Sequence, residues 1–235
     1  MLIAMLSVPV RSRRLTRDEK KAQTRRQLLQ AAATVFPRRG YHATSVDEVA
    51  EEAGFTVGAL YSNFTGKQDL FLAMLDEHFA RQMAVYSEIS SRGHTIEAKA
   101  RGAADHWMAF LASNPQFFPL FIEFWGLALR DPELRRQLSS RIRHFREAIT
   151  DLLKRDAVEL GIELPDDAAD GLAMVVNSMG NGLALHMLVD PKAVPKDLFG
   201  NMLAMVFEAL RQTYQTGATP AVTPTATQSV QGGTG

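Results

Sequence analysis

Residues 44–67 combine small side chains with hydrogen-bond donors in a pattern suited to a surface that carries phosphates. The small side chains follow one another: Thr56, Val57, Gly58 and Ala59. The donors lie on either side of them: Thr44 and Ser45 before, and Tyr61, Asn63 and Lys67 after. Small residues can approach base edges closely, and hydroxyl, amide and ammonium groups can donate to phosphate oxygens. The pattern predicts contact with double-stranded DNA, with the first group on bases and the second on phosphates.

Two short helices joined by a tight turn would position these residues. Thr44 or Ser45 can cap the first helix, with an acid three residues on completing a capping box. Gly54 stands where the chain must turn sharply, and glycine takes positive φ without steric cost. A second helix is expected over 56–64. Such a helix-turn-helix places its second helix in the major groove. An ordinary helical hairpin in a globular protein is the alternative.

A third helix is expected to begin near Lys67. Thr65 and Gln68 have the spacing of a capping box. Lys67 then lies in the first helical turn, where the helix dipole disfavours a cation, and a nearby phosphate would remove that misfit. Upstream, Thr16 and Glu19 predict the start of a helix that reaches Phe36. Pro37 predicts that this helix ends early or kinks there.

The run from residue 53 to 71 resembles the DNA-binding domain of the tetracycline-repressor (TetR/AcrR) family. The matching residues are Ala53, Gly54, Phe55, Thr56, Gly58, Leu60, Tyr61, Asn63, Phe64, Lys67 and Leu70. The resemblance is specific over residues 17–75, with Asn63 in place of the commoner histidine. It implies an all-α fold of about nine helices. In that fold a three-helix N-terminal DNA-binding domain precedes a larger helical domain for ligand binding and dimerisation.

Charge is distributed unevenly along a chain whose net charge is zero. The first 43 residues hold ten basic and two acidic side chains, so the remainder is acidic. A basic end and an acidic body suit a DNA-binding head on a sensor domain. A solvated arm without a partner is the alternative interpretation of the basic run.

Composition suggests the domain boundaries. Residues 1–15 are expected to be a disordered basic arm, 16–66 the helix-turn-helix domain, 67–216 the helical domain and 217–235 a disordered tail rich in Thr, Gly and Pro. The apolar start at residues 1–10 has neither the basic flank nor the cleavage site of a signal peptide. There is no cysteine, and no run of about 20 purely apolar residues is apparent. A cytoplasmic protein is expected.

The sequence after residue 67 reads as helix throughout. The helices are expected over 67–89, 95–114, 115–130, 132–161, 166–189 and 195–214, with a break at Pro119 in the third of these. Aromatic residues concentrate between 107 and 125, and ligand pockets are mostly apolar with a few placed polar groups. The candidate ligand-binding residues are Trp107, Phe110, Phe118, Phe121, Phe124, Trp125, His144 and Asn177, with His106 and Glu123 as further polar groups. An apolar or aromatic effector is expected, and an ordinary aromatic core is the alternative.

The last two helices are apolar on more than one face, so each must be covered on several sides. This indicates a homodimer, as the resemblance also implies, with a four-helix interface. The candidate interface residues are Met179, Leu183, Met187, Met202 and Val206. A monomer core is the alternative.

Motifs for catalysis, metals or cofactors are lacking, so an enzyme is not expected. The sequence is best interpreted as a transcriptional repressor that a small-molecule effector releases from a palindromic operator. Two alternatives remain open: a helical ligand-binding protein without operator function, and an activator or partner-binding scaffold.

Overall fold

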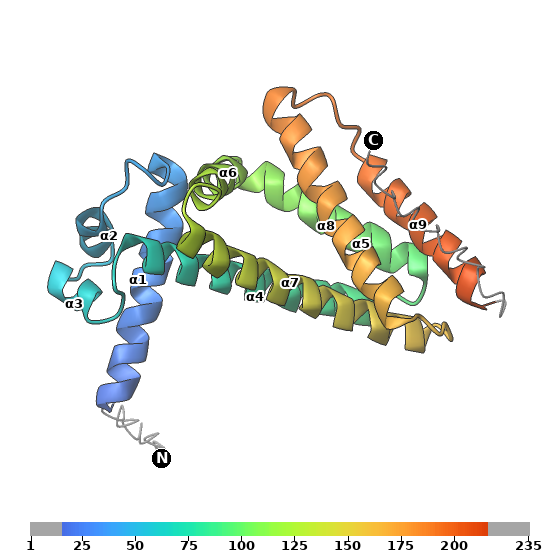
Figure 1. The fold of residues 1–235 in the computed structure, drawn as a ribbon, viewed down its shortest axis with the longest axis horizontal. Coiled ribbons are helices and arrows are strands. Elements are labelled where there is room, and N and C mark those ends of the chain that lie inside the picture. Colours follow the sequence, from blue (N-terminus) through green and yellow to red (C-terminus); the bar gives the residue numbers. More distant parts are fainter. Residues whose placement is uncertain (1–15, 216–235) are drawn as a thin grey trace, which may run out of the picture. The chain divides into compact units, whose positions relative to one another are not determined.

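The computed structural model describes residues 16–215, and this part of the chain is helical without strands, which confirms the expected all-α fold (Figure 1). The predicted arm at 1–15 and tail at 217–235 lie outside it. The nine helices of the described range are α1 (Arg17–Arg39), α2 (Val46–Glu52), α3 (Val57–Tyr61), α4 (Lys67–Arg92), α5 (Ile96–Ser113), α6 (Phe117–Ala128), α7 (Pro132–Glu159), α8 (Asp166–Val189) and α9 (Leu198–Gln215).

The helices form two compact units. In the described range, unit 1 comprises residues 16–82 and 114–141, and unit 2 comprises residues 83–113 and 142–215. Helices α4 and α7 therefore contribute to both units. Unit 1 joins the predicted DNA-binding helices to α6, so the division differs from a simple cut at residue 66.

Helix α1 begins at a complete capping box. The Thr16 hydroxyl accepts the Glu19 amide N–H at 3.2 Å, and the Glu19 carboxylate accepts the Thr16 N–H at 2.8 Å. The helix continues through Pro37 to Arg39, so the expected early end was wrong. Proline in this last turn deprives only one carbonyl of its N–H partner, that of Ala33, which lies on the exposed side of α1.

The core of unit 1 is built from the apolar faces of α1, α2 and α3 and the start of α4. Its fully buried side chains include Leu28, Val35, Phe36, Val49, Leu60, Phe64, Leu70 and Phe71. Phe124 of α6 joins this core, because its ring stacks on that of Phe71 with centroids 4.1 Å apart. The Tyr41 ring packs edge-on against Phe124 at 5.0 Å. Helix α6 is therefore packed against the segment that follows α1 and against the start of α4.

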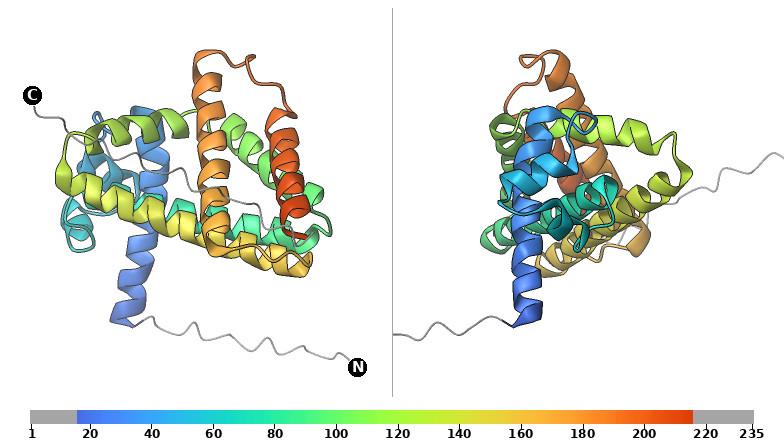
Figure 2. Two further views of the ribbon diagram at one scale, coloured as in Figure 1. Left: turned by 45° about the vertical axis from the view of Figure 1, so that its right-hand side comes forward. Right: turned by 90° about the vertical axis from the view of Figure 1, so that its left-hand side faces the viewer.

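Unit 2 is organised around α5, which packs along α9 and also contacts α8 (Figure 2). Small and large residues interlock there, since Ala100 and Ala104 of α5 meet Phe199 and Leu203 of α9. The indole Nε1 of Trp107 donates to the carbonyl of Gly180 at 3.1 Å and so ties α5 to α8. By length and composition alone α8 could cross a membrane, a property that core helices of soluble proteins share.

Two further prolines lie in the first turns of helices. Helix α6 runs unbroken from Phe117 to Ala128, so the break expected at Pro119 was wrong. Pro119 lies in the first turn, where backbone N–H groups have no partner within the helix in any case. Helix α7 begins at Pro132 as expected, and the Asp131 carboxylate accepts the N–H groups of Glu133 and Leu134 at 2.9 and 3.1 Å.

Candidate nucleic-acid interface and ligand cavity

The second helix of the helix-turn-helix, α3, is held in place from both ends. Gly54 takes φ +71° at the turn, and the Phe55 N–H donates back to the Ala50 carbonyl at 2.8 Å. Thr56 caps the helix by accepting the Ala59 N–H at 3.2 Å. Leu60 is fully buried beneath it. The helix is shorter than expected, because it ends at Tyr61 and the chain continues to residue 64 through turns.

The opposite face of α3 is accessible. Thr56 and Gly58 are exposed and the Tyr61 side chain is 55% exposed, while Val57 and Ala59 are partly buried. A methyl group added to Gly58 would meet only the Thr56 hydroxyl, at 3.9 Å. The four residues predicted to face bases, Thr56 to Ala59, and one predicted to face a phosphate, Tyr61, thus lie together on α3 and its cap.

Two of the residues predicted to contact phosphates have roles in the fold. The Thr44 side chain is buried, and its hydroxyl donates to the Gly40 carbonyl at 2.8 Å. Its expected phosphate contact is therefore withdrawn, because the hydroxyl is not accessible. Ser45 is the cap of α2: it accepts the Glu48 N–H at 3.2 Å, and the Glu48 carboxylate accepts the Ser45 N–H at 2.9 Å. That backbone hydrogen bond from Ser45 lowers the pKa of Glu48.

Asn63 is tied into the end of α3. Its side-chain Nδ2 donates to the Ala59 carbonyl at 2.8 Å, and its own carbonyl accepts a hydrogen bond from Arg25 Nη1 of α1 at 2.9 Å. The Asn63 Oδ1 atom is buried and has no hydrogen-bond partner among the described residues. The amide that was expected to donate to a phosphate is thus already used within the head.

Lys67 likewise has partners inside unit 1. Its ammonium donates to the His42 carbonyl at 3.0 Å and lies 4.6 Å from the centroid of the Tyr41 ring. Burial lowers its pKa, while the charges of Glu123 and Glu48 act in the opposite direction. The cation at the start of α4 is therefore compensated without a phosphate.

The capping box expected between Thr65 and Gln68 forms with another residue. Thr65 is paired with Asp69, whose carboxylate accepts the Thr65 N–H at 2.8 Å and the Thr65 hydroxyl at 3.3 Å. Gln68 was therefore wrongly assigned as the partner. A carboxylate accepts both donors at once and also suits the positive end of the helix dipole, whereas a glutamine is neutral.

Six of the cations of α1 form an exposed group and a paired group. Exposed cations line the first part of α1, namely Arg17, Lys20, Lys21 and Arg26. Arg38 and Arg39 at its end instead pair with Glu52 at 3.2 Å and Glu48 at 3.1 Å. The four cations of the first group remain the best candidates for a long-range attraction to phosphates.

The predicted aromatic ligand site is divided between the two units. In unit 1 Phe121 packs against Phe118 at 6.2 Å and Trp125 at 5.3 Å between ring centroids, while Phe124 belongs to the core below the head. In unit 2 Trp107 stacks on Phe110 at 5.7 Å. The structure does not gather these residues into one wall of a single unit.

The polar residues expected at that site are also divided between the two units. His144 and Asn177 belong to unit 2, where the Asn177 Oδ1 accepts from the Asn181 amide at 3.4 Å. The imidazole of His106 faces the ring of Tyr86 edge-on at 5.4 Å, and burial lowers the pKa of His106. Glu123 instead binds backbone amides of the DNA-binding head.

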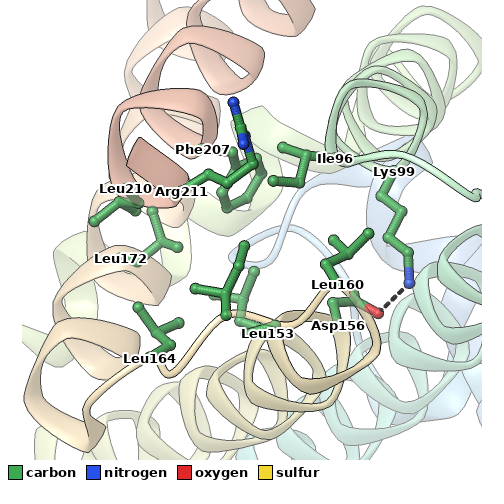
Figure 3. Close-up of a pocket in the computed structure, with 12 residues that line it drawn as sticks. Ile96, Lys99, Leu153, Asp156, Leu160, Leu164, Leu172, Phe207, Leu210 and Arg211 are labelled. Atoms are coloured by element: carbon green, nitrogen blue, oxygen red, sulfur yellow. Dashed lines mark hydrogen bonds and ion pairs between the residues drawn. The ribbon is translucent and has the colours of Figure 1, made fainter. Parts of the chain in front are cut away.

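Unit 2 contains a cavity that was not predicted. It has an internal volume of about 50 Å³ and lies between α5, the end of α7, the start of α8 and the end of α9 (Figure 3). Its lining is mainly aliphatic: Ile96, Leu153, Ala157, Leu160, Ile162, Leu164, Leu172 and Leu210, with Phe207 as the one aromatic ring, and Lys99, Asp156 and Arg211 as polar groups.

One wall of the cavity is an ion-pair network. The buried ammonium of Lys99 donates to Asp156 at 2.7 Å (Figure 3). It also donates to Glu159 at 2.8 Å, and Ser90 donates to Asp156. Burial opposes the charge of Lys99, but the hydrogen bonds with Asp156 and Glu159 raise its pKa above the ordinary value. The lysine is thus a cation that is fully engaged in holding α5 to α7.

Two of the five candidate interface residues pack against the core of unit 2. Met179 and Leu183 of α8 pack inward against the core formed by α5 and α9. Met187, Met202 and Val206 are partly buried. The exposed apolar residues of the same two helices are others, namely Met174, Val175, Leu185, Leu188, Val189 and Met205. A helix that is apolar all round gives no indication of which side faces its own subunit.

Known proteins match both parts of the chain. Residues 28–74 match the family model of bacterial regulatory proteins, tetR family, and residues 97–213 match that of the BetI-type transcriptional repressor, C-terminal. The HTH-type transcriptional activator FasR of Mycolicibacterium smegmatis is 29% identical over 187 residues, which cover 80% of each chain. The HTH-type transcriptional regulator CymR of Pseudomonas putida is 27% identical over 86% of this chain and 96% of its own.

Solved structures share the fold. A TetR-family regulator structure from Mesorhizobium loti aligns with a TM-score of 0.65 and 19% identity, covering 85% of this chain and 99% of that one. The FadR regulator of Bacillus subtilis, solved in complex with stearoyl-CoA, aligns with a TM-score of 0.59 and 18% identity, covering 77% of this chain and 96% of that one.

Proposed function

The chain belongs to the TetR family of DNA-binding transcriptional regulators, and from this premise we propose that it is a cytoplasmic repressor that binds a palindromic operator as a homodimer and is released by an apolar small molecule. The observation that carries the DNA-binding role is the accessible face of α3. It presents Thr56, Gly58 and Tyr61 outward, while Leu60 anchors the helix below. A short helix of this kind fits the major groove.

The exposed apolar residues of α8 and α9 support a dimer. Leu185 is 47% exposed and Met205 is 64% exposed, although both lie on helices whose other side is buried in unit 2. Exposed apolar patches of this kind mark association surfaces. Two-fold symmetry of the protein would then be mirrored by two half-sites about one helical turn apart, or a multiple of it.

The cavity in unit 2 supports one class of effector. Its aliphatic lining favours an apolar chain, and the FadR structure with stearoyl-CoA shows that a protein of this fold can be solved with a long-chain acyl ligand. The ring pairs Trp107–Phe110 and Phe121–Trp125 support an aromatic molecule instead. Replacing Leu172 of the cavity by Trp, and separately Phe121 by Ala, discriminates between the two places, since only one change should reduce the response to an effector.

The sign of regulation has two candidates. The C-terminal match to a repressor model favours repression, whereas the similarity to the activator FasR favours activation. Selection from random duplex DNA with the purified chain should enrich a symmetric site, and a reporter gene placed behind that site should be silenced by the protein. Enrichment of no symmetric site would refute operator binding by a dimer, and increased reporter expression would establish activation.

A further inference from the structure

A carboxylate of α6 binds two consecutive amides of the DNA-binding head. Glu123 Oε2 accepts the Tyr41 N–H and Glu123 Oε1 accepts the His42 N–H, each at 2.8 Å. These amides belong to the segment between α1 and α2. Both carboxylate oxygens are thus used on one short stretch of backbone, and hydrogen bonds to a charged acceptor are stronger than those between neutral groups.

The backbone of this turn is shaped to admit the carboxylate. Gly40 has φ +82°, a conformation that side chains rarely adopt. A Cβ atom built on Gly40 would lie 3.0 Å from Glu123 Oε2, which is tighter than nine in ten real contacts of that kind. Glycine at position 40 therefore serves two needs at once: it ends α1 and leaves room for the incoming oxygen.

The other polar groups of the turn are bound from its remaining sides. The Gly40 N–H donates to the Phe36 carbonyl at 2.8 Å, and the Gly40 carbonyl accepts from Thr44. The His42 carbonyl accepts from Lys67 at the start of α4. The two amides bound by Glu123 link the turn to α6, and Glu123 Oε1 also lies 3.9 Å from His42 Nε2.

The chemistry of the link is specific to glutamate. Glutamine has the same length but offers one acceptor and one donor, so it would set an amide donor against a backbone N–H. Aspartate keeps both acceptors but is one methylene shorter. The neighbouring Phe124 adds apolar contact through Phe71 and Tyr41, which keeps α6 close to the turn without replacing the hydrogen bonds.

We propose that Glu123 is a positioning residue for DNA recognition, in which its carboxylate fixes the turn at residues 40–42 to α6 and thereby sets the placement of the helix-turn-helix. The inference rests on the proposed DNA-binding function. It assigns to α6 a direct part in operator affinity, although none of its residues belongs to the helix-turn-helix.

The test compares the full-length chain with Glu123→Gln, Glu123→Asp and a matched control, Glu77→Gln, which removes the same charge from an exposed i,i+4 pair with Arg81 in the same unit. Three quantities are measured: amide hydrogen exchange at Tyr41 and His42, thermal unfolding, and affinity for the selected operator. Glu123→Gln should speed exchange of these two amides about tenfold or more, since each loses a charged acceptor. Operator affinity should fall at least fivefold, while the melting temperature stays within a few degrees and Glu77→Gln behaves as wild type.

The outcomes separate this inference from the proposed function. If the wild-type chain selects no DNA, the proposed function fails, and the amide exchange still decides whether the link exists. If operator affinity in Glu123→Gln is unchanged, or both amides stay protected, the inference is wrong. Should Glu123→Gln fail to fold, Glu123→Asp serves in its place, and an unchanged affinity of its folded fraction would overturn the positioning role.

Discussion

The guanidinium of Arg25 donates to the backbone carbonyl of Asn63 at 2.9 Å, and its central carbon lies 4.2 Å from the centroid of the Phe64 ring. Arg25 comes from the middle of α1, whereas Asn63 and Phe64 follow the end of α3. Carbonyls at a helix end lack partners within the helix, and a cation there is favourable. Arg25 of α1 thus supports α3 at the C-terminal end of α3, where the helix dipole is negative.

Removing this support should affect both stability and binding. Arg25→Met keeps much of the side-chain bulk but deletes the donor, and it should lower the free energy of unfolding by about 1–2 kcal/mol. Operator affinity should fall with it, because the end of α3 becomes less well ordered. Urea denaturation and gel-shift titration measure the two effects. The neighbouring exposed Arg26→Met is the control for charge, and equal losses in both variants would show that the contact with Asn63 has no role of its own.

Gly58 distinguishes a requirement of DNA binding from one of folding. A helical glycine costs about 1 kcal/mol relative to alanine, and the added methyl has open space in the free protein. Gly58→Ala should therefore leave the free energy of unfolding unchanged or slightly higher. Operator affinity should nonetheless drop about tenfold or more, because the methyl would lie between α3 and the groove. Gly126→Ala in α6 has equally open space and should raise stability alone. If Gly58→Ala keeps full operator affinity, the placement of α3 in the groove is wrong.

Charges placed on α8 and α9 should separate association from folding. Met205 is 64% exposed, so Met205→Glu should yield a folded monomer if this face is the dimer interface. Leu183 packs against the core of unit 2, so Leu183→Glu buries an unpaired charge and should unfold the unit rather than only dissociate it. Sedimentation and circular dichroism report the two outcomes. A Met205→Glu chain that remains dimeric would place the interface elsewhere.

Lys99 gives a pH dependence with a defined sign. Its pKa in the folded chain is raised, so its stabilising contribution is complete below the unfolded value of about 10.5 and is lost as the pH rises through the folded value. Lys99→Met should lower the free energy of unfolding at pH 8 by about 3 kcal/mol, since it leaves Asp156 without its cation. The difference between wild type and variant should shrink above pH 10.5. Urea denaturation across pH 8 to 11.5 tests this, and a difference that stays constant would contradict it.

Local signals in the sequence were sufficient for the helix-turn-helix. The caps at Thr16 and Ser45 depend on residues three positions away, so spacing predicted the first and narrowed the second to Thr44 or Ser45. The turn at Gly54 is likewise a local requirement. The errors at Pro37 and Pro119 arose because proline is disruptive only inside a helix, and its distance from the helix ends was not known from the sequence.

Long-range relations could not be obtained in this way. Glu123 looked like a polar group of a ligand pocket, but its partners Tyr41 and His42 are more than 80 positions away in the sequence. Met179 and Leu183 were assigned to a dimer interface because α8 is apolar on several faces, which leaves its rotation undetermined. The cavity beside Lys99 needs four helices to form, and no single stretch of sequence specifies it.

The close approach of Gly40 to Glu123 has an evolutionary consequence. A side chain at position 40 would require the carboxylate to shift by a few tenths of an ångström, and loss of the carboxylate would remove one of the two reasons for a glycine there. Among relatives, a change at one position should therefore be tolerated mainly after a change at the other, and the two sites should covary although they are far apart in the chain. A variant library that randomises both positions together should recover combinations in which a residue other than glycine at 40 accompanies a short or neutral residue at 123.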